Sequence, residues 1–363
     1  MTFFDHNVVP DKNRLLGALK GETTDRVPLF ENYIDSKLVQ RLLGYPAGNT
    51  AAAVGDPYKG DERAIVEGGM CIPMHPNDWI KICKIIGQDT IMMEAAFVPY
   101  RMRDENGVPV IINDGRVKNR ADWNSVIPPS DADVQNRVNY LKQYVEAAQK
   151  DHIAVTLCTG NFFITHYVSL CGMDFFTLIY DDIDLVHEML STAIDWYSKL
   201  VKQAVAVGID ILFSGDDVAF KSGLMMNPKH FRELYKPYAE RIYEPALNAN
   251  IPIVFDCDGK PDEIMDMIID LGCSALFPLD ANGVDYREYK EKWGDKICLF
   301  GAIDTDPLIR ENVVEVEQYI REVVTVMKTG GKYIAGTVSS VNEIPFENFM
   351  AMVNTIHQYG AYD

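Results

Sequence analysis

The chain has 363 residues, 47% of them hydrophobic, and a formal net charge of −19. This charge argues against nucleic acid and anionic membrane surfaces as partners. No apolar run reaches about 18 residues and no signal-peptide pattern opens the chain, so we expect a cytoplasmic protein without a membrane span.

Seven cysteines are scattered along the chain without a CxxC pair or zinc-finger spacing. We therefore expect free, mostly buried thiols rather than disulfides. The length suits either two domains or one α/β barrel, and the hydrophobic content is enough for a large core.

The first third of the chain predicts few regular elements. Residues 1–26 form an N-terminal extension with a short helix at 14–20, and strands are predicted at 27–31 and 89–93. Residues 98–117 predict a hairpin, because an Asn-Gly pair at 106–107 separates two apolar runs. We interpret this hairpin as an insertion after the second strand, and hypothesise that it acts as a lid.

Strands and helices alternate through the rest of the chain. Strands are predicted at 153–157, 209–213, 251–255, 275–278, 297–300 and 333–335, and helices at 134–150, 174–206, 229–249, 313–329 and 346–359. Alternating elements predict a parallel sheet, and eight strands predict a closed (β/α)8 barrel, a TIM barrel, formed by one domain over residues 1–363. An open doubly wound sheet is the alternative, although no GxGxxG motif follows an early strand.

The segment 251–280 carries the strongest pattern. A buried strand ends in Asp256, Cys257 and Asp258, a helix follows Pro261, and the next strand ends at Asp280. Charged groups directly after buried strands need a reason, because desolvating a charge is costly unless it is paired or ligated.

Acidic and amide residues follow most of the predicted strands. They are Glu31, Glu94, Asn161, Asp216, Asp217, Asp256, Asp258, Asp280 and Asp304. Aspartate is also common in turns and at helix N-caps, which is the structural alternative for each one alone. Because the carboxyl ends of barrel strands meet at one opening, the set together predicts an acidic mouth.

Such a mouth allows three roles, and the residues alone do not choose among them. It can hold a divalent metal through carboxylate oxygens or the Cys257 thiolate. It can keep one carboxyl group protonated near neutral pH as a general acid, because crowded like charges raise a pKa. It can also bind a cationic group.

Other candidates follow the third and fourth strands. His166 is the histidine that we expect to face the mouth, since the seven histidines show no HxxxH or HExxH spacing. Phe162, Phe163 and Met225 are expected to line a pocket for a flat apolar substrate, with core packing as the alternative. No GxSxG elbow, P-loop or kinase signature is present.

Five segments, in order along the chain, resemble the uroporphyrinogen decarboxylase-like superfamily and together span most of the sequence. They are RLLGALKGETTDRVPLFENY, LFSGDDVAFKSGLMMNPKHFRELYKPYAERI, IPIVFDCDGKPDEIMDMIIDLGCSALFPLD, LFGAIDT and GGKYIAGTVSSVNEIPFENFMAMV. The superfamily has a (β/α)8 barrel fold, which agrees with the strand count.

The resemblance implies one of two activities. Decarboxylases of the superfamily remove acetate carboxyl groups from a tetrapyrrole without a cofactor, and bind it through an arginine-containing motif after the first strand. Here that position reads FENYIDSKL, without arginine, and an acidic mouth would repel the substrate's carboxylates. The other branch moves methyl groups to or from a corrinoid bound to a partner protein. The segment SGDDVAFKSG is most similar to members that demethylate methoxylated, often aromatic, compounds.

Many methyltransferases of the superfamily bind zinc through an HxC motif after the fifth strand and a cysteine near the C-terminus. Here the first position reads Asp256, Cys257 and Asp258, and the second falls in TVSSV, without Cys or His. We therefore expect the zinc site to be lost or replaced. Binding of zinc or another divalent cation by Asp256, Cys257 and Asp258 stays an open expectation.

We therefore expect an O-demethylating methyltransferase of one-carbon metabolism that acts with a corrinoid-binding protein and a small methoxylated substrate. We expect no nucleic-acid or membrane partner. A homodimer is one oligomeric state that the sequence allows. Asp256, Asp258, Asp216, Asp217 and His166 are the predicted catalytic groups, and Glu31, Asn161, Phe162, Phe163, Met225 and Asp280 are the predicted substrate-binding groups. A tetrapyrrole decarboxylase and a non-catalytic ligand-binding barrel are the alternatives.

Overall fold

The computed structural model describes residues 7–50, 65–66, 70–71, 74–103, 105, 109–159, 162–280, 283–338 and 343–362. Its strands are β1 (Ile65–Val66), β2 (Met70–Cys71), β3 (Thr90–Glu94), β4 (Tyr100–Arg103), β5 (Pro109–Ile111), β6 (Ala154–Cys158), β7 (Ile211–Phe213), β8 (Ala219–Phe220), β9 (Gly223–Leu224), β10 (Ile253–Asp256), β11 (Ala275–Phe277), β12 (Cys298–Ile303) and β13 (Tyr333–Thr337). Its α-helices are α1 (Lys12–Lys20), α2 (Ser36–Leu43), α3 (Pro76–Ile86), α4 (Arg120–Trp123), α5 (Asp131–Ala148), α6 (Asp174–Asp181), α7 (Ile183–Val207), α8 (Pro228–His230), α9 (Lys236–Asn248), α10 (Met265–Asp270), α11 (Tyr286–Trp293), α12 (Thr305–Arg310), α13 (Val313–Met327) and α14 (Phe346–Tyr359).

Seven strands form one parallel sheet in the order β13-β12-β11-β10-β7-β6-β3. Each strand therefore lies beside its neighbour along the chain, and a helix joins most successive pairs, as the alternating pattern predicted. The seven predicted strands that begin between residues 89 and 333 are thus confirmed, with ends shifted by up to three residues. All seven are buried along all or nearly all of their length, because helices cover the sheet.

The predicted first strand, 27–31, is not a regular strand, and this corrects the expected count of eight. It makes one parallel bridge, Leu29 to Ala335 of β13. Pro28 has no N–H to donate, which limits the ladder. On its other side, the N–H of Glu31 donates to Oε1 of Gln88, just before β3. These contacts link both edges of the curled sheet through this one segment.

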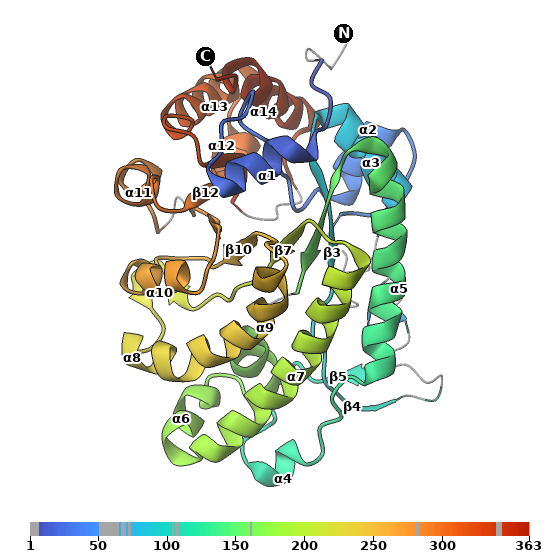
Figure 1. The fold of residues 1–363 in the computed structure, drawn as a ribbon, viewed down its shortest axis with the longest axis vertical. Coiled ribbons are helices and arrows are strands. Elements are labelled where there is room, and N and C mark those ends of the chain that lie inside the picture. Colours follow the sequence, from blue (N-terminus) through green and yellow to red (C-terminus); the bar gives the residue numbers. More distant parts are fainter. Residues whose placement is uncertain are drawn as a thin grey trace.

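Helices pack around the sheet in neighbouring pairs. α5 packs on α7, α7 on α9, and α13 on α14, and Figure 1 shows α5, α7 and α9 side by side along the strands. Local sequence fixes where several of them start: Ser130 and Asp133 form a capping box at α5, and Asn312 and Glu315 form one at α13. The expected helix 174–206 is interrupted at Asp182, which caps α7.

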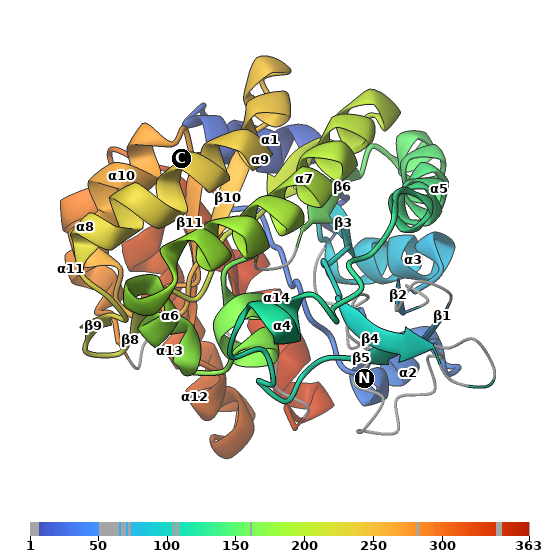
Figure 2. The same ribbon diagram turned by 90° about the horizontal axis from the view of Figure 1, so that it is seen from below.

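The predicted hairpin exists as β4 and β5, which pair antiparallel. Its Asn-Gly turn lies outside the described residues, so its role as a lid stays a hypothesis. Figures 1 and 2 place this hairpin beside α4, at the end of the molecule away from α1. Sequence patterns did not predict α2, α3 or the small β8–β9 hairpin. No helix in the described part of the chain combines the length and apolarity needed to cross a bilayer.

Candidate functional site

The loops after β7 and β10 are in direct contact at the carboxyl ends of these strands. Gly215 makes the contact possible, since a Cβ atom there would lie 2.2 Å from the backbone N and O of Asp256. The N–H of Asp258 donates to Oδ1 of Asp217 over 2.8 Å. The predicted pairs Asp216–Asp217 and Asp256–Asp258, about 40 residues apart in sequence, are therefore brought together.

Asp216 is the buried member of this group. Its side chain has no exposed surface, and its Oδ1 accepts hydrogen bonds of 2.8 Å from the N–H groups of Phe163 and Ile164. Burial raises the pKa of Asp216 well above its usual range, although these two hydrogen bonds act in the opposite direction.

Asp256 and Asp258 differ in their access to solvent. Asp256 is partly buried, and desolvation together with the charges of Asp217, Asp258 and Asp216 raises its pKa well above the usual range. Asp258 is exposed, and loss of hydration followed by the charges of Asp217 and Asp280 raises its pKa to about 7. Asp258 can therefore exchange a proton with solvent near neutral pH.

The four aspartates all have raised pKa values. Desolvation is the largest cause for each, and the charges of neighbouring aspartates add to it for Asp216, Asp256 and Asp258. Crowded carboxylates in a poorly hydrated site retain protons, because two like charges there cannot both ionise at low cost. We call these four residues the acidic cluster.

Glu31 lies at a different part of the strand ends. Its two carboxylate oxygens accept hydrogen bonds from the N–H and the hydroxyl of Thr337, at the end of β13. The side chain is buried, and desolvation raises its pKa to about 7 in spite of these bonds. Glu31 thus fastens residues 27–31 to β13, and its predicted role in substrate binding stays a prediction.

His166 is buried in the core rather than exposed at an opening. It lies in a π-helical turn, Thr165–Leu170, where its Nδ1 bonds to the carbonyl of Phe162 at 2.8 Å. Burial lowers its pKa to about 4, so the ring is neutral at neutral pH. This buried position differs from the expected one at the mouth, and the predicted catalytic role of His166 stays a prediction.

Phe162 and Phe163 are also core residues, about 1% exposed. Phe162 stacks on Tyr235 with centroids 4.8 Å apart, and Phe163 contacts Phe175 edge-to-face at 5.2 Å. These two aromatic residues therefore pack in the core, which was the alternative to lining a pocket. Met225 is partly buried, and its N–H donates to the carbonyl of Val218, beside the acidic cluster.

The described residues do not form a ready-made metal site. Among the described residues, no three His, Cys, Asp or Glu side chains gather as a metal site would require. Cys257 is buried, its thiol donates to the carbonyl of Asp258, and desolvation raises its pKa well above the usual range. Without a metal the thiol is therefore protonated at neutral pH. Binding of zinc or another divalent cation by Asp256, Cys257 and Asp258 stays a prediction.

Three further predicted residues have different outcomes. Asn161 lies outside the described residues. Asp280 is partly buried near the acidic cluster, since its charge contributes to the raised pKa of Asp258. Asp304, by contrast, caps α12 by accepting a hydrogen bond from the N–H of Asp306. Helix capping is the ordinary role of an aspartate at a strand end, as opposed to a role in a site.

Sequence reasoning placed Tyr167 among the aromatic residues expected near a substrate pocket, but it did not assign Tyr197 to the site. The Tyr167 hydroxyl donates to the carbonyl of Asp217, and the Tyr197 hydroxyl accepts from the N–H of Phe97. Burial, then the charges of nearby acidic groups including Asp216, raises the pKa of both phenols. Tyr167 lies next to His166, a predicted site residue, in the segment after β6. Nothing in the sequence signals Tyr197, in the middle of α7.

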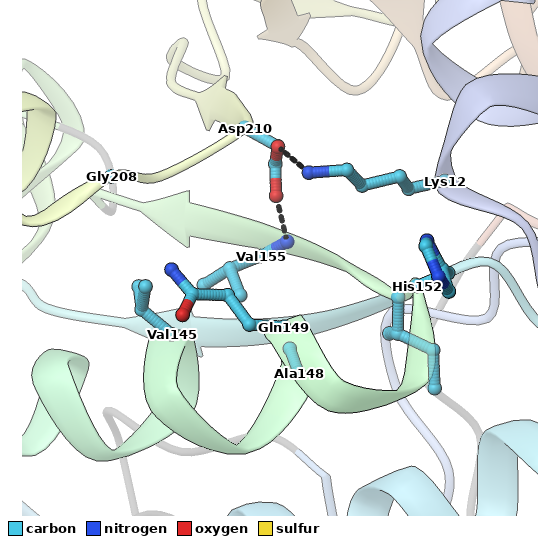
Figure 3. A pocket seen from close by; sticks show the side chains of 9 residues that line it. Lys12, Val145, Ala148, Gln149, His152, Val155, Gly208 and Asp210 are labelled. Carbon is cyan, nitrogen blue, oxygen red and sulfur yellow. Dashed lines mark hydrogen bonds and ion pairs between the residues drawn. The ribbon is translucent and has the colours of Figure 1, made fainter.

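A cavity of about 250 Å³ lies elsewhere, at the amino ends of β6 and β7. Figure 3 shows Asp210 beside it, bonded through one oxygen to Nζ of Lys12 and through the other to the N–H of Val155, each at 3.0 Å. Both oxygens of this carboxylate have partners, and none of the predicted site residues lines the cavity.

Fold and site together define a class: a TIM-barrel-like α/β protein with an acidic cluster at the carboxyl ends of its parallel strands. The family model for uroporphyrinogen decarboxylase (URO-D) matches residues 80–359, and the chain belongs to this family. A curated relative, uroporphyrinogen decarboxylase of Methylococcus capsulatus, is 24% identical over 187 residues. The match covers 50% of this chain and about half, 51%, of that relative.

Solved structures extend the fold comparison. A methyltransferase from Methanosarcina mazei superposes with a TM-score of 0.65 over 97% of this chain and 99% of its own, at 17% identity, which establishes a shared fold. A B12-independent methionine synthase from Shewanella sp. W3-18-1 covers 64% of this chain and 67% of its own, at 12% identity. Its TM-score of 0.42 is too low to support an argument.

Proposed function

We propose that this protein is a cytoplasmic methyltransferase that takes a methyl group from a small methoxylated aromatic compound and passes it to a corrinoid on a partner protein. The observation that carries the proposal is the acidic cluster, in which the N–H of Asp258 bonds to Asp217 and desolvation and like charges raise the pKa values of Asp256 and Asp258. Breaking a methyl–oxygen bond leaves an electron pair on oxygen, and a neutral carboxyl group can protonate that oxygen.

The corrinoid, when present on its carrier, supplies the nucleophile that accepts the methyl carbon. The residues of this chain orient the donor and hold the proton. The O–CH3 bond breaks, its electron pair stays on the oxygen, and the proton of Asp256 moves to that oxygen. Asp258, being exposed, is the group through which solvent can return a proton to the cluster.

Two features support this proposal over tetrapyrrole decarboxylation, the activity in the name of the family and of the Methylococcus relative. The segment after residues 27–31 has no arginine in FENYIDSKL. The acidic cluster gathers four carboxyl groups at the strand ends. A substrate with many carboxylates would therefore meet unfavourable like charges. Incubation with uroporphyrinogen and measurement of released CO2 tests this rival directly.

The central experiment compares Asp256→Asn with the wild type in a demethylation assay containing a methoxylated aromatic and reduced corrinoid protein. We expect a loss of about a hundredfold or more in kcat, the size usual for general acid catalysis. Asp304→Asn is the matched control, because this strand-end aspartate caps α12 and should leave turnover unchanged. Unchanged turnover in Asp256→Asn would remove this residue from the mechanism.

The non-catalytic alternative has its own test. A ligand-binding barrel would show thermal stabilisation by methoxy-aromatics and no demethylation with any corrinoid protein. Demethylation by the purified protein excludes it.

A further inference from the structure

We propose that Glu94 is a specificity residue of the donor site, and that it selects neutral or cationic methoxylated compounds over anionic ones. The inference rests on the proposed function, because it names the charge class of that methyl donor. Glu94 is the last residue of β3 and takes no part in the proposed proton transfer. The direction of its side chain, the groups that it faces and the contacts that fix its backbone support this role.

The side chain of Glu94 points into the interior of the curled sheet. Glu94 is in register with Cys158 of β6, and Cys158 with Phe213 of β7, so these three side chains lie on one face of the sheet. The Phe213 ring packs against Phe277 of β11 and Phe300 of β12, with centroids 5.3 and 6.3 Å away. Neither strand is a neighbour of β7, so these rings meet across the concave face. The face that carries Glu94 is therefore the interior one.

Asp256, the proposed acid, lies on the same face. It is in register with Phe277, whose ring belongs to the interior aromatic group. The charge of Glu94 helps to raise the pKa of Asp256, after desolvation and the charges of the other three aspartates of the acidic cluster. The two carboxyl groups therefore face one interior from β3 and β10. A donor whose methoxy oxygen reaches Asp256 comes within range of the charge of Glu94.

Two helices fix the segment that follows Glu94. The N–H of Phe97 donates to the hydroxyl of Tyr197, on α7, over 2.9 Å. From α5, Arg137 donates to the carbonyl of Ala96 over 3.4 Å. Phe97, Tyr197 and Arg137 are each at most 1% exposed, so these contacts belong to the packed core. The carboxyl group is thus presented by a rigid backbone, as discrimination between similar molecules requires.

The charge of Glu94 decides which donors the interior accepts. Glu94 is partly buried, so solvent screens its charge less than that of a surface residue. A donor with its own carboxylate meets like charge from Glu94 and from the acidic cluster, whereas a donor with an ammonium group meets opposite charge. Over about 10 Å, at an effective dielectric constant of about 20, one unit charge changes affinity by about tenfold.

Three donors of similar shape test this selection. They are para-methoxybenzoate, para-methoxybenzyl alcohol and para-methoxybenzylamine, which are negative, neutral and positive at neutral pH. With wild-type protein and reduced corrinoid protein, we expect kcat/KM to rise in that order, by about tenfold at each step. A wild type that uses the benzoate as well as the amine would overturn the proposal.

Glu94→Gln is the decisive variant, because glutamine keeps the size of the side chain and removes its charge. The ratio of kcat/KM for the benzoate to that for the amine should rise about a hundredfold, and a ratio equal to that of the wild type would refute the role of Glu94. Glu94→Asp keeps the charge and should keep the wild-type order of the three donors. Loss of the order in Glu94→Asp as well would show that shape decides, and would also refute it. Asp304→Asn is the control, since this strand-end aspartate caps α12 and should not change the ratio.

Calorimetric binding of the same three compounds, measured without corrinoid protein, separates this inference from the proposed function. The expected order of affinity is amine, alcohol, benzoate, and Glu94→Gln should remove it. That result supports the inference even if the wild type demethylates none of the three compounds. Absence of binding, or one order shared by the wild type and Glu94→Gln, would overturn it.

Discussion

Asp217 and Asp258, on the loops after β7 and β10, are joined by a hydrogen bond of 2.8 Å from the N–H of Asp258 to Oδ1 of Asp217. The bond places two like-charged side chains at neighbouring strand ends. Their proximity contributes to the raised pKa of Asp258, after the larger effect of lost hydration. The structure thus holds a proton-binding group near an exposed edge of the acidic cluster.

The first prediction concerns the pH dependence of demethylation. The pKa of Asp258 is raised to about 7, so the carboxyl group is mostly protonated below this pH and ionised above it. If proton return through Asp258 limits turnover, kcat should fall about tenfold for each pH unit well above 7. Asp258→Asn should lower kcat and abolish this inflection. A wild-type profile that stays flat from pH 6 to 9 would contradict the role of Asp258.

The second prediction concerns the pH dependence of stability at Glu31. Its pKa is raised from 4.5 to about 7 in the folded protein, so between these values the folded state binds more protons than the unfolded state. Stability from this residue is therefore present below pH 4.5 and is lost as the pH rises through 7. A shift of this size corresponds to about 3 kcal/mol.

Urea unfolding at several pH values measures this effect. Glu31→Gln keeps an acceptor for the N–H of Thr337 and cannot ionise. The difference in unfolding free energy between variant and wild type should therefore move in favour of the variant as the pH rises from 4.5 to 7. A difference that is constant with pH would mean that Glu31 ionises normally.

The third prediction concerns Gly215. A Cβ atom there would lie 2.2 Å from two backbone atoms of Asp256, and backbone cannot move aside as a flexible side chain can. Gly215→Ala should destabilise the protein by about 2 kcal/mol or more, and should reduce activity by separating the two acidic loops.

Ser214→Ala is a suitable control for Gly215→Ala. Ser214 is the adjacent buried residue, and its hydroxyl has no hydrogen-bond partner among the described residues, so its removal should cost less than about 1 kcal/mol. Thermal unfolding followed by circular dichroism compares the two. Equal stability of both variants would show that the loops tolerate greater separation.

The fourth prediction concerns the buried ion pair at the opposite end of the sheet. Arg14 donates to Asp89 at 2.7 Å, and both side chains are buried. Arg14→Leu leaves the carboxyl group without its charge partner and should destabilise the protein by about 3–5 kcal/mol at pH 8. Arg14→Leu with Asp89→Asn should recover part of this loss. A double variant as unstable as the sum of the two single variants would show that the pair is not coupled.

The sequence by itself determined seven strands of the parallel sheet and most of the helices between them. Buried strands read as short apolar runs and amphipathic helices repeat with their own period, so local patterns were sufficient there. The same reasoning placed acidic residues at the strand ends, and Asp216, Asp217, Asp256 and Asp258 do lie together. It predicted one strand too many at 27–31, where Pro28 limits the ladder.

Only the tertiary structure decided what each polar side chain contacts. His166 and Phe162 follow a strand end as a site residue would, yet both are buried in an aromatic core. Asp216 holds backbone N–H groups more than 50 residues away in sequence, and Tyr197 reaches the strand ends from the middle of a long helix. Hydrogen-bond partners that are distant in sequence depend on how helices and strands pack against one another. The hydrophobic periodicity of each element does not contain this information.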